Sequence, residues 1–238
     1  MSQTNARART SAWSVPRRRK AVSRARHDRR VYLAAKRSVD LVLAALTLVM
    51  LIPLMALVAL LVRLTSPGPA LFRQPRVGRD GRLFTMLKFR TMTSGCSDEL
   101  HRDYVRQLLS NDAPRSAASD GLYKLSNDPR WTPMGRFLRR TSIDELPQLF
   151  NVLRGDMSLV GPRPVLPWEA KLLQDRYADR FNVSQGMTGL WQTSGRSALT
   201  MRQALDLDLA YVARCGMLLD LRILLKTGLV VLRPGDAE

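Results

Sequence analysis

The chain has 238 residues, which is enough to bury a hydrophobic core in one domain or at most two. Its formal charge of +18 is unevenly spread, because residues 1–37 hold twelve basic side chains and the single acid Asp28, a net charge of +11. The two cysteines, Cys96 and Cys215, lie far apart and match no metal-ligand spacing. These features favour a reducing cytosolic setting and argue against a cysteine-based metal site.

The basic segment 1–35 has almost no apolar periodicity before Val31, so we expect it to be a disordered tail on its own. A tail of this kind binds either nucleic acid, through counterion release, or an anionic membrane surface. The apolar stretch that follows favours the membrane surface, and no nucleic acid partner is expected.

Residues 36–65 are predicted to be embedded in a membrane. Leu41 to Val62 is a stretch of 22 residues without a charge, interrupted near its middle by Pro53. As a helix it would extend for roughly 33 Å, which is long enough to cross a bilayer. The long basic region before it and the lack of a small-residue cleavage pattern argue against a cleaved signal peptide.

Basic residues flank the apolar stretch on both sides, whereas a spanning helix leaves one flank poor in Lys and Arg. Pro53 removes a backbone hydrogen bond and kinks a helix. A re-entrant helix-break-helix, which enters and leaves by the cytoplasmic face, therefore satisfies both flanks, and a single spanning helix is the alternative. Asp40, at the edge of the stretch, is expected to form an interfacial ion pair with Lys36 or Arg37.

Residues 66–232 are predicted to form a cytoplasmic domain, in which 94–128 is a polar, variable insertion around a helical stretch. Lys88 and Arg90 would share one face of a strand, either as solvated charges or as phosphate contacts. The expected elements are a turn at 66–69, strands at 70–74 and 83–92 joined by a hairpin turn at 77–82, and helical segments at 131–140, 146–153, 168–180 and 205–232.

The segment from Arg139 to Gln148 sets Asp144 and Glu145 directly behind two arginines. One interpretation is structural, because Ser142 and Glu145 have the spacing of a capping box at the start of the following helix, for which Gly155 is the expected end. The other is phosphate chemistry: a carboxylate can act as a nucleophile or hold a divalent cation, while guanidinium groups neutralise phosphate oxygens. The two interpretations are compatible.

Arg163 lies between two prolines in the sequence Gly161-Pro162-Arg163-Pro164, so its guanidinium is held on a stiff loop. This loop is either a rigid turn or a preorganised anion clamp. The glycine-punctuated stretch 186–196 matches neither a Walker nor a dinucleotide motif. Asp206 and Asp208 lie in a helical pattern, where aspartates are usually exposed, but one of the two could approach a cation site.

Several motifs in a fixed order carry a resemblance to one family. They are Lys36-Arg37 before the interrupted apolar stretch, Leu87 to Met92, Arg139 to Gln148, Val160 to Pro164, and Gly189 to Gln192 followed by Gly195-Arg196-Ser197. From about Lys36 to about Thr227 the chain strongly resembles the bacterial sugar transferases known as monotopic phosphoglycosyl transferases, or polyprenyl-phosphate hexose-1-phosphate transferases.

The resemblance implies an α/β, mostly helical fold in which a re-entrant membrane helix, broken at Pro53, packs on a small cytoplasmic catalytic domain. By motif position Asp144 would be the nucleophile and Glu145 the ligand of Mg²⁺. Lys88, Arg139 and Arg163 match the family's basic residues near the donor phosphates. Asp208 resembles a further acidic residue of the metal site, an assignment that Asp206, two residues away, leaves open.

The resemblance also implies a reaction. A hexose 1-phosphate would pass from a UDP-hexose to undecaprenyl phosphate through an aspartyl phospho-sugar, with release of UMP, as the first membrane step of exopolysaccharide, capsule or O-antigen synthesis. The enzyme would sit in the bacterial inner membrane with its catalytic domain on the cytoplasmic face. The sugar, the pathway and the roles of the tail and of 94–128 stay open, and a homo-oligomer is compatible with the sequence.

Overall fold

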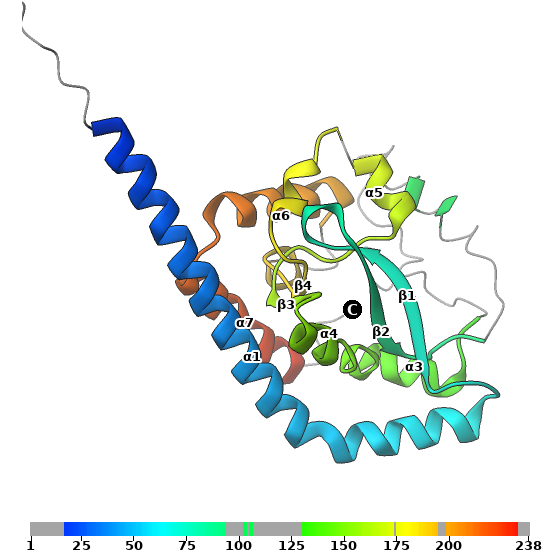
Figure 1. Cartoon of the computed structure of the whole chain (residues 1–238). Coiled ribbons are helices and arrows are strands. Elements are labelled where there is room, and N and C mark those ends of the chain that lie inside the picture. The colour runs from blue at the N-terminus through cyan, green and yellow to red at the C-terminus, as the bar shows by residue number, and fades with distance from the viewer. Residues whose placement is uncertain are drawn as a thin grey trace, which may run out of the picture.

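The computed structural model describes residues 17–93, 102–103, 105–106, 130–173, 175–194 and 199–232. The insertion predicted at 94–128 falls almost entirely outside this part, as do residues 1–16 of the tail. In the described part, the chain has a mostly helical α/β fold, in which one long N-terminal helix lies along a domain of helices and short strands (Figure 1).

Helix α1, Arg17–Thr65, is 49 residues long and contains Pro53 without interruption. Figure 1 shows it bent between its blue N-terminal part and its cyan C-terminal part. The predicted break is therefore a bend within a continuous helix. The helix begins at Arg17, inside the segment 1–35 for which a disordered tail is predicted, and the disorder of that tail on its own stays a prediction. Arginine, lysine and alanine are good helix formers, and a helix that has already nucleated extends at low cost.

Between Arg29 and Thr65, most apolar side chains of α1 are exposed, including Val49 at 69% and Met50 at 80%. In the described part of the chain, Arg29–Thr65 is the helical segment long and apolar enough to cross a membrane. A surface of this kind is rare on soluble proteins, and it indicates association with a membrane.

The predicted hairpin is confirmed. Strands β1, Leu71–Val77, and β2, Leu83–Phe89, pair antiparallel from Leu71 opposite Phe89 to Val77 opposite Leu83. The turn between them contains Asp80 and Gly81, both with positive φ, a conformation that glycine and aspartate tolerate best.

Arg90, directly after β2, is buried and serves neither of the roles predicted for it. Its guanidinium donates to the carbonyl oxygens of Ser66, at 2.8 Å, and of Pro67, and its Nη2 lies 3.4 Å from the carbonyl oxygen of Val62. These groups belong to the last turn of α1 and the residues after it, where carbonyls lack helical partners. Arg90 therefore caps the C-terminal end of α1.

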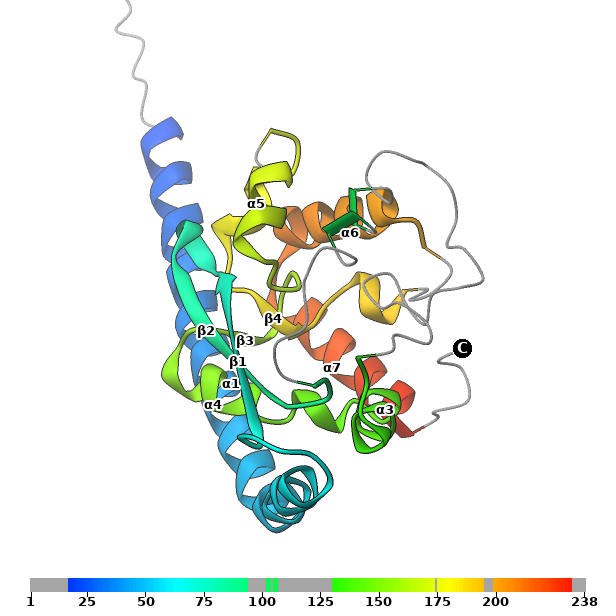
Figure 2. The same ribbon diagram turned by 90° about the vertical axis from the view of Figure 1, so that its right-hand side faces the viewer.

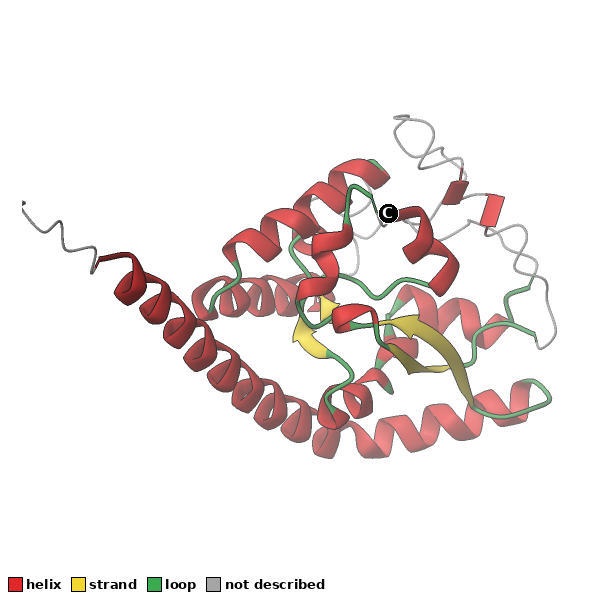
Figure 3. Ribbon diagram, turned by 45° about the horizontal axis from the view of Figure 1, so that its top comes forward, coloured by secondary structure: helices red, strands yellow, loops and turns green. Residues whose placement is uncertain are grey.

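A second, parallel pair of short strands joins β3, Ser158–Val160, to β4, Gly186–Thr188. Figure 3 shows both pairs of strands surrounded by helices. Before β3 come α3, Pro133–Arg140, and α4, Gln148–Arg154, close to their predicted positions. Helix α4 ends at Gly155, whose φ of 93° confirms the predicted stop.

The remaining helices differ in extent from the prediction. The helix expected at 168–180 is α5, Pro167–Leu173, followed after a turn by a 3-10 helix, Ala178–Asn182. In place of the single helix expected at 205–232, the structure has two helices, α6, Met201–Arg214, and α7, Met217–Leu232. The backbone leaves helical geometry between them, at Cys215. In Figures 1 and 2, α5 and α6 lie at the end of the domain away from the C-terminal part of α1.

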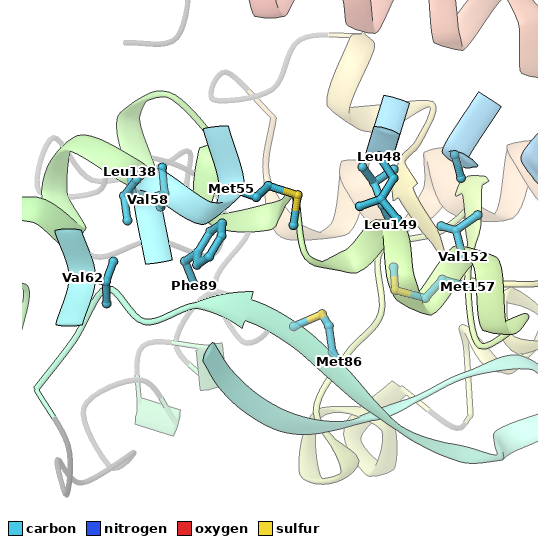
Figure 4. Close-up of a cluster of buried hydrophobic side chains, with 11 residues drawn as sticks. Leu48, Met55, Val58, Val62, Met86, Phe89, Leu138, Leu149, Val152 and Met157 are labelled. Carbon is cyan, nitrogen blue, oxygen red and sulfur yellow. The ribbon is translucent and has the colours of Figure 1, made fainter. Parts of the chain in front are cut away.

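Two main hydrophobic clusters support this arrangement. In the first, α1 packs on β2, α3 and α4, as Figure 4 shows for Leu48, Met55 and Phe89. The second joins the end of β1 to α5 and α6, with Val165 and Trp191 among its buried members. Lys88 precedes Phe89 of the first cluster, and Arg163 precedes Val165 of the second. The predicted phosphate-binding residues are thus attached to both cores.

The ion pair predicted for Asp40 is wrong. Its carboxylate is 5% exposed and accepts hydrogen bonds from the Ser158 hydroxyl and the Leu159 backbone N–H. Lys36 pairs instead with Asp220, and Arg37 donates to backbone carbonyls of α4. The prediction failed because it considered only neighbours in the sequence, whereas this face of α1 packs on the folded domain.

Candidate active site

The acidic pair lies between two helices. Asp144 is buried, with 5% exposure, in a 3-10 helix, Ile143–Glu145, ahead of α4. Ser142 does not form the capping box, because its φ of 56° is left-handed and its side chain makes no capping bond. A left-handed residue other than glycine costs about 1 kcal/mol or more. The purely structural interpretation of this segment is therefore wrong in its capping detail.

Glu145 is the centre of a charged cluster. Its Oε1 lies 2.8 Å from Nζ of Lys88 and 3.3 Å from Nη2 of Arg163. All three side chains are about a fifth exposed or less, so their charges are only partly screened by water. The structure thus brings together, from β2, the 3-10 helix and the loop after β3, three residues that the sequence singled out.

The protonation of Lys88 reports on this environment. Burial lowers the pKa of Lys88 from its ordinary value, and Arg163 adds to this, while the carboxylates of Glu145 and Asp144 oppose it. The carboxylates thus favour the charged form of Lys88, whereas burial and the Arg163 guanidinium disfavour it. Such a group gains from an additional anion, for example a phosphate.

Asn151 of α4 holds the part of β2 that carries Lys88. It is fully buried, accepts from the backbone N–H of Leu87 at 3.0 Å and donates to the carbonyl of Thr85 at 2.7 Å. These bonds fasten β2 to α4, directly beside the acidic pair. Sequence reasoning missed this residue, although an asparagine on the apolar side of a short helix is a signal for a buried polar contact.

The loop that carries Arg163 is fixed by its backbone. Gly161 packs so closely on β4 that a Cβ atom would collide with the carbonyl oxygen of Ser184. The carbonyl oxygen of Arg163 accepts a hydrogen bond of 2.8 Å from Nη2 of Arg180, a fully buried arginine. The predicted stiffness of this loop therefore comes from glycine packing and from Arg180 as well as from the two prolines.

Asp208 is connected to this loop through Arg180, whose Nη2 donates both to the carbonyl oxygen of Arg163 and to Asp208. Its Oδ2 is 2.7 Å from Nη2 of Arg180, and burial raises the pKa of Asp208 to about 6 although Arg180 opposes the shift. Asp206 points outward, half exposed, 3.7 Å from Arg176. Of the two acids, only Asp208 is near Arg163, and its carboxylate is engaged by Arg180.

Arg139 lies at the end of α3, with its guanidinium carbon 5.0 Å from the centre of the Trp131 ring. A cation over an indole face is attracted by the ring and is held in a defined orientation. The motif residue Arg196 falls outside the described residues. The predicted roles of Arg139, Asp208 and the other site residues stay predictions.

Two features define the class of protein: a long apolar helix with membrane character, and a carboxylate pair facing basic side chains on its attached domain. The family model "Bacterial sugar transferase" matches residues 31–234, so the chain belongs to the bacterial sugar transferase family.

Curated relatives agree with this assignment. The chain is 44% identical over 203 residues to "Undecaprenyl-phosphate galactose phosphotransferase" of Salmonella typhimurium, covering 85% of this chain and 41% of that protein. It is 39% identical over 193 residues to "Exopolysaccharide production protein ExoY" of Rhizobium meliloti, covering 81% and 83%. It is 42% identical over 200 residues to "UDP-glucose:undecaprenyl-phosphate glucose-1-phosphate transferase" of Caulobacter vibrioides, covering 81% and 67%. The chain thus spans about two fifths of the Salmonella relative and most of the Rhizobium one.

Proposed function

We propose that this chain transfers a hexose 1-phosphate from a UDP-hexose to undecaprenyl phosphate, releasing UMP, in the synthesis of an exopolysaccharide, capsule or O-antigen. The observation that carries the proposal is the cluster of Lys88 and Arg163 around Glu145, next to the buried Asp144, on a domain attached to an apolar helix. The names of the Salmonella and Caulobacter relatives support the substrates.

In the proposed mechanism, an Asp144 carboxylate oxygen attacks the sugar-linked phosphorus of the donor. A bond forms between that oxygen and phosphorus, and the phosphorus–oxygen bond to UMP breaks, so UMP leaves with the electron pair. A phosphate oxygen of the lipid then attacks the same phosphorus and displaces the Asp144 carboxylate. Two successive displacements let one site serve two anionic substrates in turn.

The basic residues would act on charge. Lys88 and Arg163 would neutralise the donor's pyrophosphate oxygens, which otherwise repel the Asp144 carboxylate, and stabilise the charge that develops in the transition state. Arg139, oriented by the Trp131 ring, is proposed to join them. Because Lys88 and Arg163 already contact Glu145, the donor's phosphates would draw them partly away from that carboxylate.

The residues fit a Mg²⁺ ion that is held jointly by the protein and by the phosphates of the substrate. Magnesium is usually held by one or two carboxylates together with substrate phosphates and water. Glu145 supplies a carboxylate, and among the described residues no three His, Cys, Asp or Glu side chains gather as a metal site of their own. Glu145 would hold the ion, with Asp208 as the second predicted ligand, and the ion would supply charge neutralisation at the pyrophosphate.

The proposed location is the bacterial inner membrane, with the domain on its cytoplasmic face. The exposed apolar side chains of α1 support insertion, and four exposed leucines on α7, at Leu218, Leu221, Leu225 and Leu229, recur at helical spacing. Exposed Arg222 and Lys226 on the same helix suit an anionic lipid surface.

Replacement of the nucleophile tests the proposal. In full-length protein in nanodiscs, we expect Asp144→Asn to reduce UMP release from a panel of UDP-sugars by on the order of 10³-fold or more, because the amide cannot attack phosphorus. Mass spectrometry should find a phospho-sugar on Asp144 of the unsubstituted protein. Asp80→Asn, in the exposed hairpin turn, is the matched control and should retain full activity. Undiminished turnover by Asp144→Asn would refute the mechanism.

A further inference from the structure

One face of the N-terminal part of α1 is polar and packs against the domain. Tyr32, Lys36, Arg37 and Asp40 are spaced so that they lie on one side of a helix. Each makes a hydrogen bond or ion pair with a residue at least 115 positions away. Figure 1 shows α4, β3 and α7 along this part of α1, and residue contacts join each of them to it. We call these four residues the polar face of α1.

Asp40 fixes β3 at its outer edge. Its Oδ2 accepts from the Ser158 hydroxyl at 2.7 Å, and its Oδ1 accepts from the backbone N–H of Leu159 at 3.2 Å. The opposite edge of β3 pairs with β4, so Asp40 occupies the position that a further strand would take. Hydrogen bonds to a carboxylate are stronger than those between neutral groups. Three residues after Val160, where β3 ends, the chain reaches Arg163.

Arg37 holds α4, the helix that follows the acidic pair. Its two terminal nitrogens donate to the carbonyl oxygens of Val152, at 2.6 Å, and Leu153, at 2.9 Å, in the last turn of α4. Carbonyls at a helix end lack the full set of helical partners, and a guanidinium both satisfies them and complements the helix dipole. Helix α4 begins at Gln148, three residues after Glu145, so its placement sets the placement of the acidic pair.

Lys36 and Tyr32 complete the attachment. Both contact Oδ2 of the buried Asp220, at 2.9 Å each, and the Tyr211 hydroxyl lies 2.7 Å from Oδ1. That hydroxyl also lies 3.2 Å from the carbonyl oxygen of Val160, the last residue of β3. Burial, together with Asp220, raises the pKa of Tyr211, so this hydroxyl remains protonated and can donate. A second route thus connects α1 to the base of the Arg163 loop.

We propose that the polar face of α1 positions the active site: Arg37 and Asp40 hold the Asp144-Glu145 segment and the Arg163 loop at the separation that lets both contact one donor pyrophosphate. The inference rests on the proposed function. None of the four residues touches the reacting atoms; they act through α4 and β3. The membrane helix is then part of the catalytic framework as well as an anchor. In this structure, Nη2 of Arg163 lies 3.3 Å from Oε1 of Glu145.

The test compares kcat and KM for the UDP-sugar in full-length protein in nanodiscs. Asp40→Ala releases β3, and we expect kcat/KM to fall by about tenfold to a hundredfold with a clear rise in KM, because misplacing a phosphate-binding group by about 1 Å can cost that much. Asp40→Asn keeps an acceptor for Leu159 and should recover most of the loss. Ser38→Ala, an exposed change on the same helix, is the matched control and should behave as the unsubstituted protein.

Ser158→Ala gives a milder variant, so the test survives if Asp40→Ala fails to fold. It removes the hydroxyl's bonds to Asp40 and to the Val160 backbone, and it leaves the bond between the Leu159 N–H and Asp40 in place. The double variant Asp40→Ala with Ser158→Ala should lose less than the sum of the two single losses, since both changes disrupt the contact between Asp40 and Ser158. Hydrogen exchange of the amides at 158–164 should accelerate in Asp40→Ala and not in Ser38→Ala.

The outcomes separate the two hypotheses. If the unsubstituted protein releases no UMP from any UDP-sugar in the panel, the proposed function fails. If it is active, and the Asp40 and Ser158 variants have unchanged KM and lose kcat only in proportion to their unfolded fraction, the polar face has a purely stabilising role. The positioning inference is then overturned while the proposed function stands.

Discussion

The neighbours of Lys88 shift its pKa in opposite directions, and single substitutions can separate their contributions. Glu145 raises the pKa of Lys88, whereas burial and Arg163 lower it. We therefore expect Glu145→Gln to lower the pKa of Lys88 further and Arg163→Gln to raise it. The rate at which a small acylating reagent modifies Lys88, followed by peptide mass spectrometry across pH, measures both shifts. Lys171, exposed on α5, is an internal control. Shifts of the same sign in both variants would contradict the observed cluster.

The raised pKa of Asp208 makes the stability of the fold depend on pH. This pKa is raised from 3.8 to about 6 because burial penalises the ionised form more than Arg180 favours it. The folded state then binds the proton more tightly than the unfolded state. The stabilisation from this group is present below about pH 4 and is lost as pH rises to about 6, by up to roughly 3 kcal/mol.

Denaturant unfolding in detergent from pH 4 to 7 checks this. The free energy of unfolding should fall more steeply with rising pH in the unsubstituted protein than in Asp208→Asn, which has no proton to lose at this site. Asp206→Asn is the matched control, since that carboxylate is half exposed and its ion pair with Arg176 is a long one on the surface. Identical pH slopes for the unsubstituted protein and Asp208→Asn would show that the Asp208 pKa is not raised.

Among the elements, the end of α1 depends on a side chain from the hairpin. Arg90 is buried and donates to carbonyl oxygens in and after the last turn of α1. Arg90→Ala leaves these acceptors unsatisfied, so we expect a loss of about 2 kcal/mol or more in unfolding free energy. Arg90→Lys should recover only part of it, because an ammonium lacks the planar fork. Arg73→Ala, exposed on β1, is the control. A similar melting temperature for both alanine variants would argue against the cap.

Local patterns predicted the elements better than the contacts between them. The hairpin and the ends of α3 and α4 follow from turn residues, helical spacing and Gly155, all of which act within a few residues. The partners of Asp40 and Arg90 lie 118 and about 25 residues away, so no local rule could find them. Lys88, Glu145 and Arg163 were identified through their motifs, but their convergence on one oxygen needed the tertiary fold. Arg180, which fixes the loop, carried no motif at all.

For the whole molecule, the two ends of the apolar stretch of α1 attach to one folded unit. Just before this stretch, Arg37 and Asp40 bond to α4 and β3. At its C-terminal end, Arg90 bonds to the last carbonyls, and Arg90 directly follows β2. Asn151 in turn joins β2 to α4. These hydrogen bonds connect both ends through a single small domain. The hydrocarbon core of a bilayer, about 30 Å thick, would separate the two ends if the helix simply crossed it.

We therefore expect both ends of the apolar stretch of α1 to lie on the cytoplasmic side, as a re-entrant helix requires. In a background with Cys96 and Cys215 replaced by serine, Arg30→Cys and Arg82→Cys place single thiols at exposed positions before and after the apolar stretch. A membrane-impermeant maleimide should label both in inside-out vesicles and neither in right-side-out spheroplasts. Met50→Cys, in the exposed apolar middle of α1, should react only after detergent is added. Labelling of the two positions from opposite sides would establish a spanning helix, and it would mean that the hydrogen bonds at one end of α1 cannot form in the membrane.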